Sequence, residues 1–157
     1  MKLDMLEKIL KVIIVTFLMI MTCVVTLQIL TRYFMQNPLG WSEEVTRYLF
    51  IYLTFLAASL GVRHGIHIGV DILTERLSGV SKKILHLFVN ALLILFILLL
   101  IYYGTVLSID NWSQKSPSLS LPMGIFYAAI PIGSILSLFF VVENTLLHLP
   151  KKGDEIS

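Results

Sequence analysis

Hydrophobic residues in this sequence are gathered into four long blocks that contain no charged side chain. The blocks run over residues 12–31, 48–62, 87–109 and 123–142. A helix rises about 1.5 Å per residue, so about 20 such residues cross a hydrocarbon core about 30 Å thick. We therefore predict an all-α membrane protein that forms one domain over residues 1–157, with transmembrane helices at about residues 9–34, 44–63, 84–109 and 122–147.

The first block follows three lysines, which is also how a secretory signal begins. Its 20 uncharged residues are more than the roughly 7–15 of a signal's apolar core, and Arg32 and Tyr33 follow it instead of the small residues of a cleavage site. We expect this block to remain as the first helix.

The starts of the second and fourth helices carry residue types typical of helix ends. Glu43 and Glu44 suit the positive end of the helix dipole, and Pro122 suits a first turn, where its missing N–H costs nothing. Pro131 falls inside the fourth block and predicts a kink there.

A short amphipathic segment is predicted between the second and third helices, at about residues 68–78. Val70, Leu73 and Leu77 recur at helical spacing, while the polar residues between them fall on other faces. We expect this segment to lie as a short helix at the membrane surface and to end at Ser78 and Gly79.

The distribution of lysine and arginine predicts the orientation. Nine of them lie in residues 1–11, 63–83 and 148–157, whereas the opposite connections hold only Arg32, Arg47 and Lys115. Cytoplasmic segments of membrane proteins carry the excess of positive charge. Both termini and the amphipathic segment are therefore predicted to be cytoplasmic.

The composition supports a lipid environment and excludes one class of partner. Apolar residues make up 57% of the chain and charged residues 14%, with a net charge of +2. Because the chain has no basic tract, we expect no nucleic acid partner. The single cysteine, Cys23, lies within the first block and is interpreted as a packing residue.

The chain offers little for transport or catalysis on its own. Every charged residue lies at or beyond a helix end, whereas ion-coupled carriers keep ionisable residues near the middle of the membrane. This argues against a self-sufficient small exporter, and we expect no enzymatic activity.

Two alternatives involving a bound group were considered. A membrane anchor of a redox complex would hold haem between histidines inside facing helices, but all four histidines lie near predicted helix ends. His64, His67 and Asp71 share a helical face and could bind a metal, although Gly65 and Gly69 favour a hydrogen-bonded turn instead. We therefore predict no cofactor and no metal site, and interpret a cytoplasmic interfacial cluster of Arg63, His64, His67 and Asp71.

Small residues at four-residue spacing allow helices to approach closely. Ala129, Gly133 and Ser137 form such a packing stripe on the fourth helix, and the second helix ends in small residues at 57–59 and 61. The third helix has no such stripe and is expected to face lipid. Whether the stripes meet only one another or also a partner helix is left open.

The predicted outer connection is dense in charged and aromatic residues. Glu43 and Arg47 are spaced for a pair within one helix, and Trp41 can anchor the helix at the membrane surface. We interpret this connection as an outer structural or docking segment formed by Arg32, Tyr33, Pro38, Trp41, Ser42, Glu43, Glu44 and Arg47.

Three stretches in order resemble the small permease subunit, DctQ type, of tripartite ATP-independent periplasmic (TRAP) transporters. Residues 32–50 contain Trp-Ser-Glu-Glu, residues 63–71 read Arg-His-Gly-Ile-His-Ile-Gly-Val-Asp, and residues 116–127 begin Ser-Pro-Ser-Leu-Ser-Leu-Pro. Together they bracket all four predicted helices. Ser120 departs from the family pattern, in which glycine is common at this position.

The resemblance implies a multi-pass protein of the bacterial inner membrane that works with two other proteins. One is a large permease, expected as a separate chain, which carries substrate and sodium. The other is an extracytoplasmic substrate-binding protein. The small subunit would brace the large permease and help to dock the binding protein during uptake of an organic acid.

Overall fold

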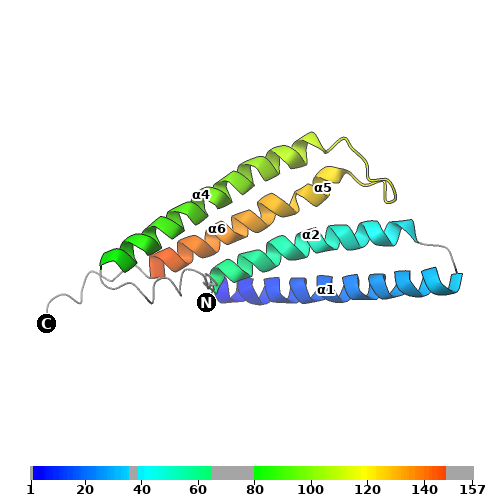
Figure 1. Cartoon of the computed structure of the whole chain (residues 1–157), viewed down its shortest axis with the longest axis horizontal. Helices are drawn as coiled ribbons and strands as arrows, with labels where there is room; N and C mark the ends of the chain where they lie inside the picture. Colours follow the sequence, from blue (N-terminus) through cyan, green and yellow to red (C-terminus); the bar gives the residue numbers. More distant parts are fainter. Residues whose placement is uncertain (1, 36–38, 65–79, 148–157) are drawn as a thin grey trace.

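The computed structural model describes residues 2–35, 39–64 and 80–147, and these residues are helical apart from a loop and short connections (Figure 1). The helices are α1 (Lys2–Met35), α2 (Gly40–Arg63), α4 (Val80–Asp110), α5 (Met123–Tyr127) and α6 (Ala129–Leu147). Within the described ranges, four spans are long and apolar enough to cross a membrane. The prediction of an all-α protein with four transmembrane helices is confirmed.

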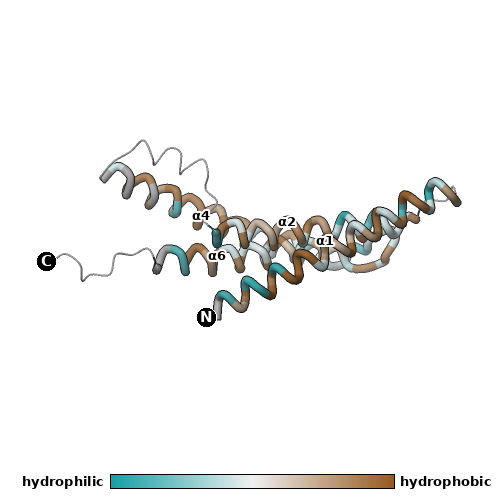
Figure 2. Tube along the Cα trace, turned by 90° about the horizontal axis from the view of Figure 1, so that it is seen from below, coloured by the Kyte–Doolittle hydropathy of each residue, from teal (hydrophilic) through white to brown (hydrophobic). Residues whose placement is uncertain are grey.

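The helices lie side by side in one layer, in the order α1, α2, α6, α4. Contacts join α1 to α2, α2 to α6 and α6 to α4, whereas no close backbone contact joins α1 to α6 or α4 among the described residues. Figure 1 shows this row face on, and Figure 2 shows it from below as a thin, twisted layer. Helices α1 and α4 are therefore the two edges.

The start of α1 and the end of α2 lie at the same end of the layer, together with the end of α6 (Figure 1). We call this the N-terminal end. The opposite end holds the start of α2 and the connection over residues 111–122 between α4 and α5 (Figure 1). We call this the loop end.

Helix α1 begins at Lys2 rather than at about residue 9. Its first turns have partners that the spacing of apolar residues did not indicate: Leu6 and Leu10 pack in a core cluster with Leu56 and Phe140, and Asp4 pairs with Arg63. Helix α2 also begins earlier than predicted, at Gly40, and α4 begins at Val80 rather than at about residue 84.

The predicted fourth helix is divided at Ala128 into α5 and α6. Proline has no backbone N–H, so Pro131 cannot donate to the carbonyl of Tyr127, four residues earlier. The division falls directly after that carbonyl. Ala128 keeps helical dihedral angles, and the N–H of Ile132 donates to its carbonyl oxygen at 3.1 Å, so the two pieces together form one span over Met123–Asn144.

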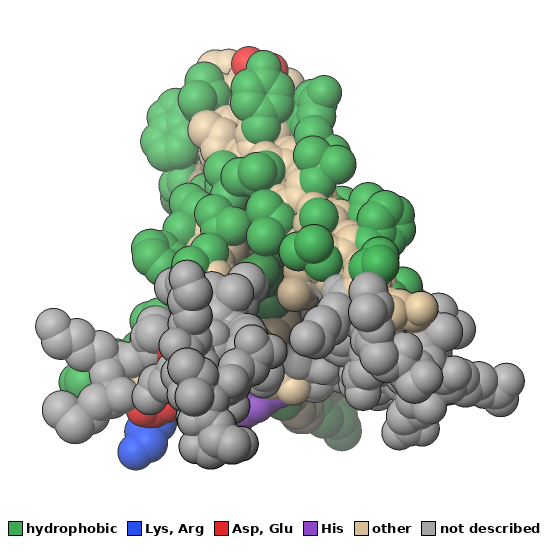
Figure 3. All heavy atoms as spheres, turned by 90° about the vertical axis from the view of Figure 1, so that its left-hand side faces the viewer, with side chains coloured by type: hydrophobic (Ala, Val, Ile, Leu, Met, Phe, Trp, Pro, Cys, Tyr) green, Lys and Arg blue, Asp and Glu red, His purple; other side chains and the backbone are tan. Residues whose placement is uncertain are grey.

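Most apolar side chains in the layer are left uncovered by the rest of the chain. In the most apolar stretch of α1 no residue is buried, compared with 39% in the span formed by α5 and α6. Figure 3, viewed from the N-terminal end, shows hydrophobic side chains over the visible flank, with charged groups gathered near the bottom of the view. The expectation that α4 faces lipid and α1 faces protein has to be corrected, because α1 is at least as exposed as α4.

Candidate functional site: polar clusters at the two ends of the layer

Glu44 is the centre of the polar cluster at the loop end. Its side chain is buried and receives hydrogen bonds from the backbone N–H groups of Ser118 at 2.8 Å and Leu119 at 3.0 Å. The hydroxyl of Tyr48 donates to the other carboxylate oxygen at 2.5 Å. A carboxylate accepts bonds through both oxygens, so a single residue of α2 ties down the loop that follows α4.

Two tyrosines of α2 extend this connection towards α5. The ring of Tyr48 stacks on that of Phe126, and the hydroxyl of Tyr52 donates to the carbonyl oxygen of Ile125 at 2.6 Å. The ring of Tyr52 also meets the edge of Phe17 from α1, with centroids 6.3 Å apart. Tyr52 therefore links three helices at the level where the fourth span is divided.

The loop over residues 113–122 has hydrogen bonds of its own. Ser116 donates its N–H to Leu121 at 2.8 Å, and Met123 donates to Gln114 at 2.8 Å. Ser120 has a φ of 55°, in the left-handed region that glycine occupies without steric cost. This explains why glycine suits the position at which the sequence departs from the family pattern.

Gly124 closes the junction between α4 and α5. A Cβ atom there would lie 2.3 Å from the carbonyl oxygen of Ser108 and 2.7 Å from the ring of Trp112. Ser108 also donates its hydroxyl to the carbonyl oxygen of Gly124 at 2.6 Å. Only glycine lets the two backbones approach this closely.

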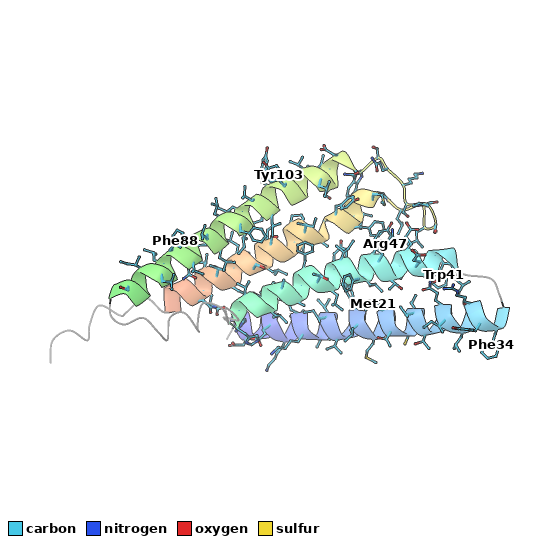
Figure 4. The ribbon with its side chains drawn as sticks, in the orientation of Figure 1. Met21, Phe34, Trp41, Arg47, Phe88 and Tyr103 are labelled. Atoms are coloured by element: carbon cyan, nitrogen blue, oxygen red, sulfur yellow. The ribbon has the colours of Figure 1, made fainter. Side chains whose placement is uncertain are left out.

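The predicted outer segment divides into buried and exposed members. Ser42 is fully buried and donates its hydroxyl to the carbonyl oxygen of Leu39 at 2.6 Å. Glu43 and Arg47 pair at 2.9 Å, but their side chains are 69% and 67% exposed. Trp41 lies at the start of α2 and is partly exposed (Figure 4).

Arg32 and Tyr33 lie exposed in the last turn of α1. Neither joins the cluster around Glu44. Pro38 lies outside the described residues. The segment predicted as one unit is therefore two surfaces, of which only Ser42 and Glu44 are enclosed.

Arg63 is the centre of the polar cluster at the N-terminal end. Its guanidinium contacts Asp4 at 2.8 Å and Glu7 at 2.9 Å, both on α1, and lies 5.3 Å from the ring centroid of Phe140 on α6. A planar guanidinium can pair with carboxylates along its edge while its face lies over an aromatic ring. One side chain at the end of α2 thus joins α1 and α6.

Asn144 completes this junction from α6. Its side-chain amide donates to the carbonyl oxygens of Arg63 at 3.0 Å and Val62 at 3.3 Å, which belong to the last turn of α2. His64 lies 3.3 Å from Glu7. His67 and Asp71 of the predicted interfacial cluster lie outside the described residues, as does the amphipathic segment at about 68–78.

The stripe of Ala129, Gly133 and Ser137 faces α2 within the same chain. A Cβ atom on Gly133 would lie 2.6 Å from the Cβ of Phe55 and 2.8 Å from its carbonyl oxygen. Ala129 and Ser137 are both buried. The small residues of α2, in contrast, are partly left open: Ala58 is exposed, and nothing lies within 4 Å of a Cβ built on Gly61.

These clusters are suited to holding helices together rather than to catalysis. Each charged residue in them lies near a helix end, and the spans between carry none at mid-depth. Across the described ranges, no group of three or more histidine, cysteine or acidic residues could hold a metal ion.

Sequence reasoning singled out the wrong glutamate and missed several partners. Glu43 and Arg47 drew attention as an ion pair, whereas Glu44 and Tyr48 have the same four-residue spacing and form the buried contact. That spacing was a usable signal. The roles of Asp4, Glu7 and Asn144 depend on which helix ends meet, and no local pattern indicates this.

Comparisons with known proteins agree with this arrangement of helices without a catalytic centre. Residues 21–151 match the family described as the DctQ component of tripartite ATP-independent periplasmic transporters. Over 131 residues the chain is 31% identical to a putative TRAP transporter small permease protein of Haemophilus influenzae, with 83% of this chain and 81% of that protein covered.

Two further relatives are matched over smaller parts of their length. The chain is 37% identical over 103 residues to the C4-dicarboxylate TRAP transporter small permease protein DctQ of Rhodobacter capsulatus, with 64% of this chain and 45% of that protein covered. It is 33% identical over 124 residues to the sialic acid TRAP transporter permease protein SiaT of Haemophilus influenzae, with 76% and 20% covered. The chain thus spans less than half the length of either relative.

Proposed function

This chain belongs to the family of DctQ components of TRAP transporters, as a small permease subunit, and from that premise we propose that it braces a large permease and helps to dock an extracytoplasmic substrate-binding protein. The transported solute is an organic acid, and uptake is driven by a sodium gradient. The protein is a multi-pass subunit of the bacterial inner membrane and catalyses no reaction.

The observation that carries this proposal is a rigid layer with apolar faces and no charged residue at mid-depth. A charged or polar relay near the bilayer centre is the usual requirement for moving ions. Because the spans of this chain lack one, the large permease supplies the path for substrate and sodium. The names of two relatives, which refer to C4-dicarboxylate and sialic acid, support an acidic solute.

The surface proposed to meet the large permease is the exposed stripe of α2. Phe50, Thr54, Ala58 and Gly61 lie on one face of this helix, and no other helix of the described chain covers it. Small side chains let a neighbouring transmembrane helix approach closely, so that van der Waals contacts form along its length. The exposed side chains of α4 that Figure 4 labels, Phe88 and Tyr103, are large and point away from α6.

The surface proposed to help dock the binding protein is the loop over residues 113–121. Its polar side chains are mostly exposed, while Glu44 holds its backbone from below. A loop that is fixed before binding loses less conformational entropy when a partner docks. The support offered by Glu44 therefore favours a docking role for this loop over that of the exposed Glu43 and Arg47 pair.

Reconstitution tests the proposed function directly. The chain, a large permease and a binding protein from the same genome are placed in liposomes, and uptake of C4-dicarboxylates and sialic acid is followed with and without a sodium gradient. We expect uptake only when all three proteins and the gradient are present. Flux through this chain alone, or full uptake without it, would contradict the proposal.

Co-purification with the large permease tests the proposed contact surface. Gly61→Leu fills the open stripe of α2 and should lower recovery of the large permease while the subunit itself accumulates normally. Thr105→Leu, at an exposed position of α4, is the matched control and should have no effect. Gly133→Leu should instead lower the amount of folded subunit, because its side chain meets Phe55 within the chain. Normal recovery with Gly61→Leu would show that the partner binds elsewhere.

A further inference from the structure

We propose that the hollow at the end of α1 binds the phosphate group of a membrane phospholipid. The hollow has a volume of about 500 Å³ and is lined by Ile29, Arg32 and Tyr33. It lies in the last two turns of α1, at the loop end and at one edge of the layer. The site is separate from the two polar clusters and from the proposed contact stripe of α2.

Arg32 brings an uncompensated positive charge to this hollow. Arg47 pairs with Glu43, and Arg63 pairs with Asp4 and Glu7. Of the arginines that the structure describes, Arg32 alone has no carboxylate within 4.0 Å. The carbonyl groups at the end of α1 carry only a partial negative charge, so the guanidinium still favours a full anion.

The depth of the hollow matches the phosphate layer of a bilayer. The apolar span of α1 ends at Phe34, which places Arg32 and Tyr33 in its last turn. Tyr33 is 81% exposed, and Trp41 lies at the neighbouring start of α2. Tyrosine and tryptophan collect at this level of membrane proteins, where a phenol hydroxyl can donate to a phosphate oxygen.

Below Arg32, the same side of α1 can accommodate an acyl chain. Thr22 and Thr26 follow Ile29 towards the middle of the helix, and their hydroxyls donate to the carbonyl oxygens of Leu18 and Thr22 at 2.8 Å each. With these hydroxyls bonded to the helix, the threonines leave a shallow surface with no unmet donor. The surface lies on an edge helix, so lipid can reach it from the side.

These two parts together favour a phospholipid over a carboxylate of a protein partner. A phosphodiester oxygen pair fits the fork of a guanidinium, and the attached acyl chain fits the apolar side of α1 below it. A carboxylate on a soluble protein would use Arg32 alone and leave the exposed Ile29 and the threonine surface uncovered.

Native mass spectrometry of the full chain, released from mild detergent and titrated with phosphatidylglycerol, tests this assignment. We expect Arg32→Gln to weaken the tightest lipid adduct about tenfold, as expected for loss of a charge-assisted hydrogen bond. Arg47→Gln removes a positive charge at the same end of the layer and is the matched control, expected to bind lipid like the unmodified chain. Thermal unfolding measured in parallel shows that both variants are folded.

A soluble competitor distinguishes lipid from free phosphate. Glycerophosphoglycerol, which has the same headgroup without acyl chains, should not displace phosphatidylglycerol at equal concentration, and full displacement would overturn the assignment to lipid. Equal loss of lipid in the Arg32 and Arg47 variants would reduce the effect to general charge and also overturn it. Unchanged lipid binding in Arg32→Gln, with lowered recovery of the large permease, would assign Arg32 to a protein contact instead.

Discussion

At the scale of single residues, Glu43 and Glu44 are adjacent in the sequence but have opposite surroundings. Glu43 and its partner Arg47 extend away from the chain, where an exposed ion pair contributes roughly 0–1 kcal/mol. Glu44 is enclosed and accepts three hydrogen bonds from two other parts of the chain and from its own helix. The expectation that the Glu43 and Arg47 pair is the costly one to break is therefore replaced by the same expectation for Glu44.

We predict that Glu44→Ala destabilises the subunit and that Glu43→Ala does not. The first change leaves the N–H groups of Ser118 and Leu119 without an acceptor, and each buried unpaired donor costs about 1–3 kcal/mol. Thermal unfolding in detergent provides the measurement, and uptake in liposomes shows whether the loop matters for transport. Equal unfolding midpoints for the two variants would contradict the proposed support of the loop.

At the scale of helices, glycine has different roles in α2 and at the start of α5. Gly61 faces open space, whereas Gly124 lies against the backbone of α4. Packing decides the cost of adding one methyl group, because an extra atom in a filled space shifts backbones or side chains.

We predict that Gly124→Ala lowers stability by about 1–3 kcal/mol, since its Cβ would overlap the carbonyl oxygen of Ser108. Gly61→Ala is the control and should be neutral or gain up to about 1 kcal/mol, the difference in helix propensity between the two residues. Thermal unfolding of both variants, with loss of helical signal as the readout, checks this. An equally stable Gly124→Ala protein would mean that α4 and α5 can move apart without cost.

At the scale of the whole molecule, the layer has two chemically different ends. The loop end holds Ser113 on an exposed loop, and Ser81 lies exposed in the first turn of α4 at the opposite end. The excess of lysine and arginine places the N-terminal end in the cytoplasm, and this orientation remains a prediction.

We expect an impermeant thiol reagent applied to intact cells to label a cysteine at position 113 and not one at position 81. Both single cysteines are introduced after Cys23→Ser, which removes the only native thiol. Cells opened before labelling should show both positions, which controls for reactivity. Labelling at 81 but not at 113 in intact cells would reverse the topology.

The sequence by itself determined the class of the protein and the number of its spans. Both depend on local properties: an uncharged stretch such as residues 87–109 must lie in lipid because of its own length and composition, and Pro131 removes a helix hydrogen bond wherever the helix packs. The motifs at 32–50 and 116–127 also indicated the family from residue identity alone.

Only the tertiary structure decided how the helices are ordered and which polar residues are enclosed. Arg63 meets Asp4 across 59 positions of sequence, and Glu44 meets Ser118 across 74, so neither contact leaves a local pattern. The same holds for the stripe containing Gly133: its spacing indicates close packing, but only the position of Phe55 shows that the partner is α2 of the same chain. Local periodicity fixes the face of each helix, and the neighbour that covers that face follows from packing over the whole chain.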